Sequence, residues 1–177
     1  MGGRVPMSDR DFWASRGLSP PPRDNAYDVM QVCLNGHQIT DRLEESPYEA
    51  KPFCPQCGAK TIVACPECKT PIQGYLKLYE FGEASLPNNC HACGTAYPWR
   101  QDALAAAIEA VEMELEGQDA TDAAALIAAV SVDTPRTELS ALRLKKLLGK
   151  LSKPVYDVAI KIVSDVAAAT AKSHLGL

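Results

Sequence analysis

The sequence lacks several features that would assign it to large classes of protein. No apolar run approaches the about 20 residues that a membrane-spanning helix needs, and the first residues do not follow the basic, apolar, small-residue order of a secretory signal. We therefore expect a cytoplasmic protein, whose cysteines stay reduced. There is also no Ser/His/Asp arrangement, no glycine-rich phosphate loop and no carboxylate pair with an evident role. These absences lead us to expect that the chain is not an enzyme.

Cysteine is present in a pattern that predicts metal binding. All seven cysteines lie between residues 33 and 93, and six of them form three C-x-x-C pairs. The unpaired Cys33 is followed by His37, and Gly36 between them can take the positive φ that a knuckle turn often requires. Eight donors fill two closed tetrahedral Zn²⁺ sites, one of three cysteines and a histidine and one of four cysteines. The predicted metal ligands are Cys33, His37, Cys54, Cys57, Cys65, Cys68, Cys90 and Cys93.

The order in which these pairs combine is open from the sequence. Tandem order joins Cys33/His37 to the Cys54 pair and the Cys65 pair to the Cys90 pair, with 16 and 21 residues between the knuckles of each site. Crossed order, as in RING-type ligase domains, usually places the middle pairs closer together than the seven residues found here. We favour tandem order. A disulfide framework is a third interpretation, which the reducing compartment disfavours.

Composition divides the chain into a flexible tail over residues 1 to 24, a double zinc-ribbon domain over 25 to 100 and a helical domain over 101 to 177. Alternating or β-branched segments at 27 to 33, 37 to 40, 60 to 64 and 74 to 79, with a last segment at 95 to 99, predict small antiparallel hairpins. The predicted fold class is α+β, with tandem zinc ribbons followed by about four helices. Because such hairpins bury little apolar area, each metal ion would have to supply about 10 to 16 kcal/mol of folding free energy.

Apolar spacing predicts helices at about 101 to 116, 121 to 131, 134 to 151 and 154 to 173. Gly117 is expected to stop the first, and Thr134-Pro135 to open the third. The side chains expected to face the core in the first, third and fourth helices are Leu104, Ile108, Val111, Leu115, Leu139, Leu142, Leu144, Leu147, Leu148, Leu151, Val155, Val158, Ala159, Ile162, Val163 and Val166.

Charge is distributed unevenly over the helical region. Residues 101 to 135 hold eight acids and no base, whereas residues 136 to 177 hold eight bases and three acids. The simplest interpretation is that acids and bases face each other within one bundle, as Glu109, Glu112, Glu114 and Glu116 would with Arg143, Lys145, Lys146 and Lys150. Association of residues 136 to 172 with an anionic membrane surface, or oligomerisation, are the alternatives.

Zinc ribbons also occur in proteins that bind nucleic acids, and this is a further hypothesis. Binding to phosphates requires a basic surface, but residues 25 to 100 carry six bases against eight acids. We therefore disfavour nucleic acid as the partner. The aromatic residues Tyr75, Tyr79, Tyr97 and Trp99 are interpreted as filling a small core rather than stacking on bases.

The motifs together resemble a known family. They are the segment from Tyr27 to His37, Phe53-Cys54-Pro55-Gln56-Cys57-Gly58, Cys65-Pro66-Glu67-Cys68, Cys90-His91-Ala92-Cys93-Gly94, Tyr97-Pro98-Trp99 and the Asp133-Thr134-Pro135-Arg136-Thr137 segment with the helix after it. Over residues 25 to 172 they resemble a family of uncharacterised bacterial proteins with paired zinc ribbons. This resemblance implies a bacterial, cytoplasmic zinc protein, and it implies no biochemical activity.

From the sequence we expect a structural and interaction protein. Its zinc ribbons would display loops and hairpins to a protein partner, and its helical region would help the chain to fold, oligomerise or dock. A RING-like ligase platform is the least favoured alternative, because it requires crossed pairing of the zinc ligands.

Overall fold

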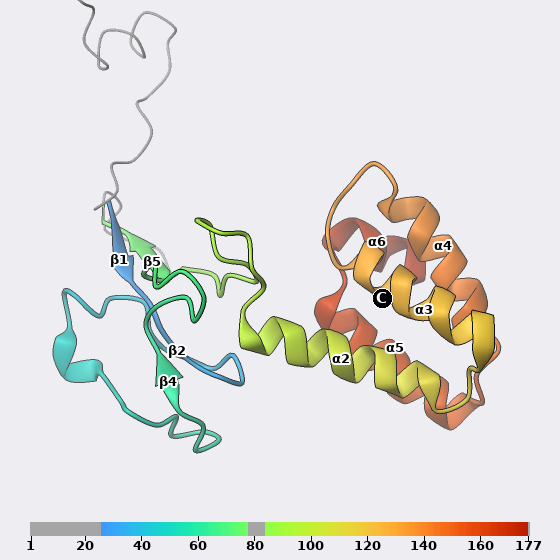
Figure 1. The fold of residues 1–177 in the computed structure, drawn as a ribbon, viewed down its shortest axis with the longest axis horizontal. Helices are drawn as coiled ribbons and strands as arrows, with labels where there is room; N and C mark the ends of the chain where they lie inside the picture. Colours follow the sequence, from blue (N-terminus) through green and yellow to red (C-terminus); the bar gives the residue numbers. More distant parts are fainter. Residues whose placement is uncertain (1–25, 78–83, 177) are drawn as a thin grey trace, which may run out of the picture.

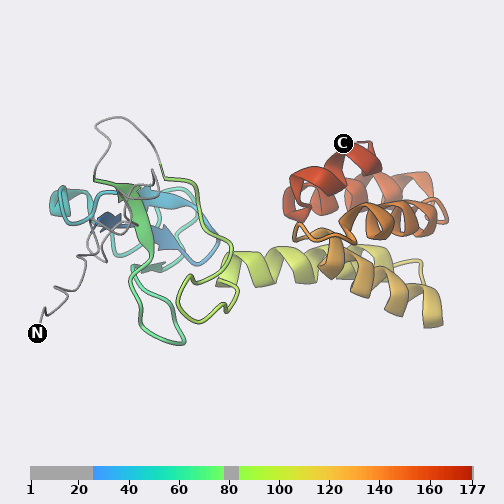
Figure 2. The same ribbon diagram turned by 90° about the horizontal axis from the view of Figure 1, so that it is seen from above.

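The secondary structure changes from strand to helix along the chain. The computed structural model describes residues 26–77 and 84–176, and this part holds five short strands, all before residue 77, and five α-helices, all after residue 97. The strands form one body and most of the helices another, with α2 (Pro98–Glu112) leading from the first to the second (Figure 1 and Figure 2). The predicted α+β class, with small hairpins ahead of a helical region, is confirmed. The predicted tail lies outside the described residues.

Two small sheets share the segment of residues 27 to 33, for which the sequence predicts one strand. β1 (Tyr27–Val29) pairs antiparallel with β5 (Gln73–Leu76), whereas β2 (Gln31–Cys33) lies between β3 (Gln38–Thr40) and β4 (Thr61–Ile62). The chain changes sheet at Met30, whose side chain is fully buried and whose N–H donates to the Ile72 carbonyl at 2.8 Å. A single 3-10 turn, Pro47–Glu49, follows in the polar loop after β3. Cys33 therefore lies at the end of the central strand β2, which pairs with a neighbouring strand on each side.

α2 begins earlier than the sequence predicts and includes residues assigned there to the second ribbon. The helix starts at Pro98, where a missing N–H and a fixed φ suit the first turn. Trp99 and Arg100 therefore project from a helix. The buried Arg100 guanidinium donates to the Val166 carbonyl at 2.9 Å and to the Ser131 carbonyl. Burial lowers the pKa of Arg100, and its carbonyl contacts tie the first turn of α2 to the other helices.

The helical region holds one helix more than predicted. After α2 come α3 (Gly117–Val130), α4 (Thr137–Leu148), α5 (Lys153–Val166) and α6 (Ala169–Leu175). The predicted last helix is divided at Ala167 and Ala168, whose ψ values of 140° and 157° are extended. Ala168 donates its N–H to the Val130 carbonyl at 2.9 Å. A contact between distant segments breaks this helix, and no glycine or proline marks the position.

Each of the two bodies has its own apolar cluster at its centre. The helical cluster centres on fully buried residues from all five helices, among them Val111, Ile127, Leu144, Val163 and Ala171. The ribbon cluster is smaller and consists of Met30, Val32, Cys65, Ile72, Cys90, Tyr97 and Trp99.

Three residues that the sequence predicts to face inward are instead exposed. Leu139 is 51% exposed, and Leu142 and Val158 are both 54% exposed. On α4 the buried positions Ala141, Leu144 and Leu148 recur every three or four residues, so Leu139 and Leu142 fall on the outer side of that helix.

Charged residues of the helical region pair less than the sequence suggests. Within the described residues, one ion pair joins the acidic segment to the basic one, from Lys150 Nζ to Asp119 Oδ2 at 2.5 Å. The expected pairing of residues 109 to 116 with Arg143 and Lys146 is not observed there, and Glu114 instead accepts hydrogen bonds from Ser152. Across the described ranges no helix has the length and apolar content to cross a bilayer.

Candidate metal centres

All eight predicted ligands come together in two groups of four. The first group is Cys33, His37, Cys54 and Cys57, and the second is Cys65, Cys68, Cys90 and Cys93. Within each group the donor atoms lie within 4.8 Å of one another. The pairing is therefore tandem, and the crossed, RING-like alternative is wrong. His91 and His174 belong to neither group.

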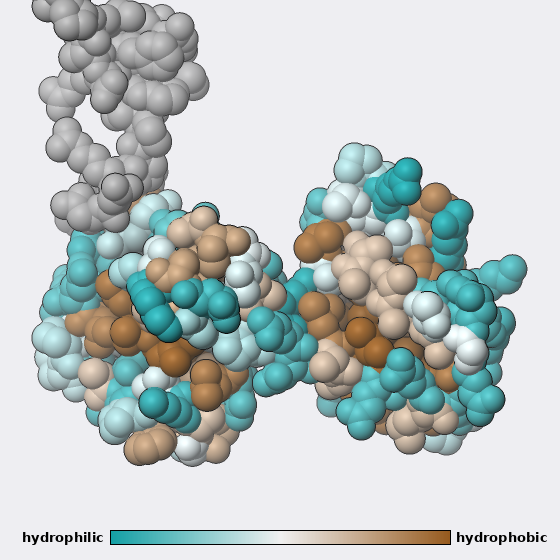
Figure 3. All heavy atoms as spheres, in the orientation of Figure 1, coloured by the Kyte–Doolittle hydropathy of each residue, from teal (hydrophilic) through white to brown (hydrophobic). Residues whose placement is uncertain are grey.

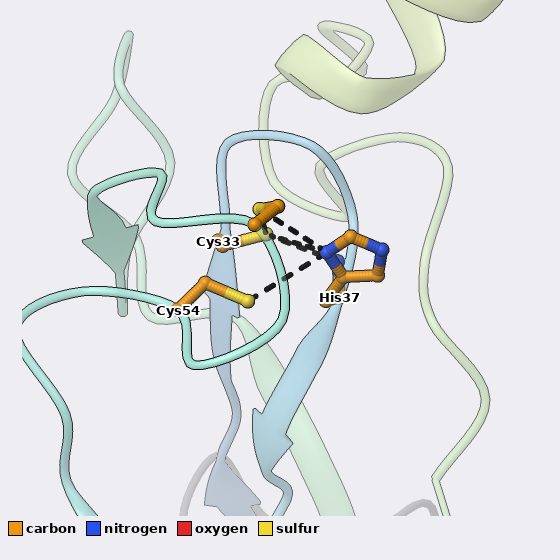
Figure 4. A group of neighbouring side chains, drawn as sticks. Cys33, His37 and Cys54 are labelled. Carbon is orange, nitrogen blue, oxygen red and sulfur yellow. Dashed lines mark hydrogen bonds between the residues drawn. The ribbon is translucent and has the colours of Figure 1, made fainter.

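The first group is built by the turn between β2 and β3 and by the turn before β4. His37 Nδ1 lies 3.5 Å from Cys33 Sγ, 3.6 Å from Cys54 Sγ and 3.3 Å from Cys57 Sγ. The Sγ atoms of Cys33 and Cys57 are 3.8 Å apart. Figure 4 shows one ring nitrogen of His37 facing the sulfurs and the other pointing away from them. Nδ1 is thus the nitrogen placed to bind a metal.

The second group is built by the turn after β4 and by the turn that precedes α2. Cys65 Sγ lies 3.8 Å from Cys93 Sγ, and Cys68 Sγ lies 3.6 Å from Cys90 Sγ. A disulfide bond would place its sulfurs about 2.05 Å apart, so none joins these pairs, and all seven cysteines are free thiols. The disulfide interpretation is wrong.

The spacing of both groups fits tetrahedral zinc. With Zn–S bonds of about 2.3 Å and a Zn–N bond of about 2.05 Å, a tetrahedron has S···S edges of about 3.8 Å and S···N edges of about 3.6 Å. The observed sulfur pairs, at 3.6 to 3.8 Å, and the sulfur–nitrogen pairs, at 3.3 to 3.6 Å, lie close to these edges. Four protein donors fill each tetrahedron, so neither arrangement leaves a position for substrate or water.

Backbone hydrogen bonds give the three C-x-x-C turns the same shape. In each, the first cysteine donates its N–H to the carbonyl five residues on and accepts from the N–H four residues on, at 2.8 to 3.0 Å. The residue after the second cysteine then has positive φ. Two of these residues are glycines, Gly58 and Gly94, with φ of 73° and 75°, and the third is Lys69 with φ of 63°. Lys69 therefore occupies a conformation that favours glycine.

Hydrogen bonds favour the thiolate form of two cysteines. Burial raises the pKa of Cys54, but the backbone N–H groups of Gln56 and Cys57 more than offset this and lower it to about 7. The hydroxyl of Thr70, 3.2 Å from Cys68 Sγ, lowers the pKa of Cys68 to about 6, with help from the Thr70 backbone. Thiolates are the form that binds metal, so these contacts favour binding at one donor of each group, whereas burial raises the pKa of Cys33.

Further residues that contact the donor atoms are not identified by the sequence analysis. Asn35 Nδ2 donates to Cys57 Sγ at 3.4 Å, and Thr70 contacts Cys68. The Tyr97 hydroxyl is hydrogen-bonded to Cys90, and burial together with this cysteine raises the pKa of Tyr97. Asn35 lies inside the Cys33-to-His37 turn and Thr70 lies two residues after Cys68, so proximity along the chain is the signal that could have found them.

An aromatic pair connects the two groups. Tyr97, beside Cys90, stacks on Trp99 with ring centroids 4.7 Å apart and planes at 15°. Trp99 in turn packs against the first knuckle, because a Cβ added to Gly36 would stand 2.9 Å from Trp99 Cβ. Trp99 Nε1 also donates to the Pro87 carbonyl at 3.0 Å. The predicted core-filling role of these two rings thus includes holding the two groups against each other.

Comparison with known proteins assigns the chain to a family. Residues 26–175 match the family model described as "Uncharacterized protein conserved in bacteria (DUF2321)". Searches of the curated proteins and of the solved structures found no match to the chain. The match extends over both groups of donors and all five helices, and we conclude that this chain belongs to that uncharacterised bacterial family.

Proposed function

We propose that each group of four donors binds one Zn²⁺ ion and that the chain is a zinc-stabilised interaction protein with no reaction of its own. The observation that carries this proposal is the agreement between the donor spacings and the edges of a tetrahedron around zinc. Tetrahedral sulfur-rich sites select zinc or iron, and the imidazole in the first group favours zinc. Closed four-donor sites are typical of structural zinc rather than catalytic zinc.

The ribbon body has a physical need for such ions. Its buried cluster comprises only seven residues, two of which are donors themselves. A core of this size offsets only part of the conformational entropy lost when the ribbon body is ordered. Because metal binding and folding are coupled in small sites of this kind, two bound ions would add stability that the apolar core lacks. The role assigned to the donors is therefore to hold the fold.

The surface of the first ribbon supports a protein partner rather than a nucleic acid. Tyr48 and Phe53 are large and exposed. A hollow of about 680 Å³ lies beside Tyr48, and the charged residues of its lining are three acids, Asp41, Glu45 and Glu49, and one base, Arg42. These carboxylates would repel phosphates, whereas an exposed aromatic beside polar groups is common in protein interfaces. The proposed role of this face is to dock a protein segment.

Native mass spectrometry of the full chain tests the proposal. We expect two zinc ions per chain, one zinc in Cys57→Ser or Cys93→Ser, and loss of ordered ribbon structure with the lost ion. His91→Ala is the matched control, because His91 lies between Cys90 and Cys93 but outside the group of donors. This variant should keep both ions. A Cys57→Ser variant that retained two ions and unchanged melting behaviour would refute the proposal.

A further inference from the structure

The outer side of α3 and α4 forms a groove with charged walls and an apolar floor. Its volume is about 520 Å³, and its apolar lining is Ala125, Leu126 and Leu147. α3 contributes Asp119 and Asp122 to one wall, and the basic wall consists of Arg143 and Lys146 of α4 and of Lys150 just after that helix. The groove therefore presents charges of both signs along two neighbouring helices.

The two helices run in opposite directions, so the groove has distinct ends. The ion pair between Lys150 and Asp119 joins the end of α4 to the start of α3, and the Thr137 hydroxyl donates to the Val132 carbonyl at the opposite end. The charged residues gather toward the first of these ends. In Figure 3 hydrophilic side chains lie at the right-hand end of the helical body, where α3 starts, and apolar ones lie over its middle.

Apolar residues continue the groove toward its second end. Leu139 precedes Arg143 by four residues and Leu142 precedes Lys146 by four, which places each leucine on the same side of α4 as the base that follows it. Both are exposed. Two large apolar side chains on one side of α4, next to a groove with an apolar floor, indicate a contact surface. The face that we call the α3–α4 face comprises the groove and these two residues.

We propose that the α3–α4 face binds the same face of a second copy of this chain, with the two-fold axis parallel to the helices. This axis places α3 of each copy opposite α4 of the other and keeps equivalent ends together. The acidic wall of one copy then meets the basic wall of the other at the charged end, and apolar side chains meet apolar ones at the second end. The face is therefore complementary to itself in charge and in the position of its apolar side chains.

The charges of the α3–α4 face favour a second copy over an anionic membrane. Arg143 and Lys146 have no ion-pair partner within the described residues, whereas Lys150 is already paired with Asp119. A bilayer surface would meet Asp119 and Asp122 together with the bases, and like charges would repel it. A second copy supplies an acidic wall for the basic one and a basic wall for the acidic one.

This inference gives the interaction role proposed above a specific partner, and it does not depend on which metal the donors bind. It is tested by sedimentation velocity and native mass spectrometry of the full metal-loaded chain at increasing concentration. We expect a dimer whose dissociation constant rises about tenfold or more in Leu142→Glu. Val158→Glu is the matched control, because Val158 is as exposed as Leu142, at 54%, and lies on α5 outside this face.

A charge-reversal experiment tests the proposed axis. Lys146→Glu and Asp122→Lys should each weaken the homodimer, because each puts like charges opposite each other twice. A mixture of the two variants should form a heterodimer, since every facing pair is then of opposite sign. A heterodimer no stronger than the two homodimers would overturn the proposed geometry.

Three results would overturn the inference as a whole. The first is a wild-type chain that stays monomeric over the concentration range, and the second is equal weakening by Val158→Glu and Leu142→Glu. The third is a monomer that binds vesicles of anionic lipid and loses this binding in Lys146→Glu. Two zinc ions per chain in the same spectra would leave the zinc proposal standing even if dimerisation failed.

Discussion

Replacing Gly36 with alanine probes the contact between the first knuckle and Trp99. Gly36 has a φ of +84°, and an added Cβ would stand 2.9 Å from Trp99 Cβ and 3.1 Å from Trp99 Cγ. The tryptophan cannot move away freely, because its ring stacks on Tyr97 and its Nε1 is bonded to the Pro87 carbonyl. The turn that carries Cys33 and His37 would have to shift instead.

The size of this effect follows from a comparison with Gly58. Gly58 belongs to the same group of donors and also has positive φ, at +73°, but nothing lies within 4 Å of an added Cβ. Gly58→Ala should therefore cost only the backbone strain, about 1 to 2 kcal/mol. Gly36→Ala adds overpacking of about 1 to 3 kcal/mol. Since metal binding and folding are coupled, the first site should bind zinc about 5- to 150-fold more weakly in Gly36→Ala than in Gly58→Ala.

Competition with a zinc-binding dye measures this difference. The proportion of zinc removed from each variant is followed at increasing dye concentration, with Gly94→Ala as a second control in the other group, where an added Cβ also meets open space. Equal zinc retention in Gly36→Ala and Gly58→Ala would refute the argument that Trp99 supports the first knuckle.

Three further predictions concern the helical region, the turn from Cys65 to Lys69 and the effect of pH on zinc binding. Arg100→Met removes both buried carbonyl contacts of Arg100 and should lower the free energy of unfolding of the helices by about 3 kcal/mol. The variant should still bind two zinc ions. Calorimetry with metal analysis checks this, and an unchanged melting temperature would contradict it. Lys69→Gly relieves the one positive-φ non-glycine residue among those described and should raise zinc retention by the equivalent of up to about 1 kcal/mol, and weaker retention would count against it. The pKa values of Cys54 and Cys68, about 7 and about 6, lie below the ordinary 9.0, so their contribution to the folding stability of the ribbons is full above pH 9.0 and is lost as the pH falls through 7 and then 6. Zinc affinity measured from about pH 8 to pH 5 should therefore fall as protons compete for the donors, and an affinity independent of pH would be inconsistent with thiolate ligands.

The donor set could be predicted from the sequence because its determinants are local. A C-x-x-C pair closes a turn whose hydrogen bonds lie within six residues, so its spacing predicts its shape wherever the chain places it. Tandem order followed from the seven residues between Cys57 and Cys65, which include the strand β4. The remaining donor, His37, could be identified because it lies four residues after the unpaired Cys33, with Gly36 between them to form the turn.

Features that depend on distant contacts could not be predicted in the same way. Nothing near Ala168 indicates a break, because its cause is the hydrogen bond to Val130. The change of sheet at Met30 likewise depends on Ile72. Leu142 was expected in the core because it is apolar. It is exposed because only one side of α4 packs against the rest of the helical body. The contact of Tyr97 with Cys90 depends on how the start of α2 packs against the turn from Cys90 to Cys93.

X-ray absorption spectroscopy at the zinc edge of the metal-loaded chain tests the central claim most directly. Seven sulfurs and one nitrogen shared by two ions predict an average of about 3.5 sulfur neighbours at about 2.3 Å and about 0.5 nitrogen neighbour at about 2.05 Å per zinc. Cys57→Ser should lower the total zinc to one ion per chain and leave a signal of sulfur neighbours alone. A spectrum with several oxygen neighbours, or a wild-type chain that binds fewer than two ions, would contradict the two closed structural sites.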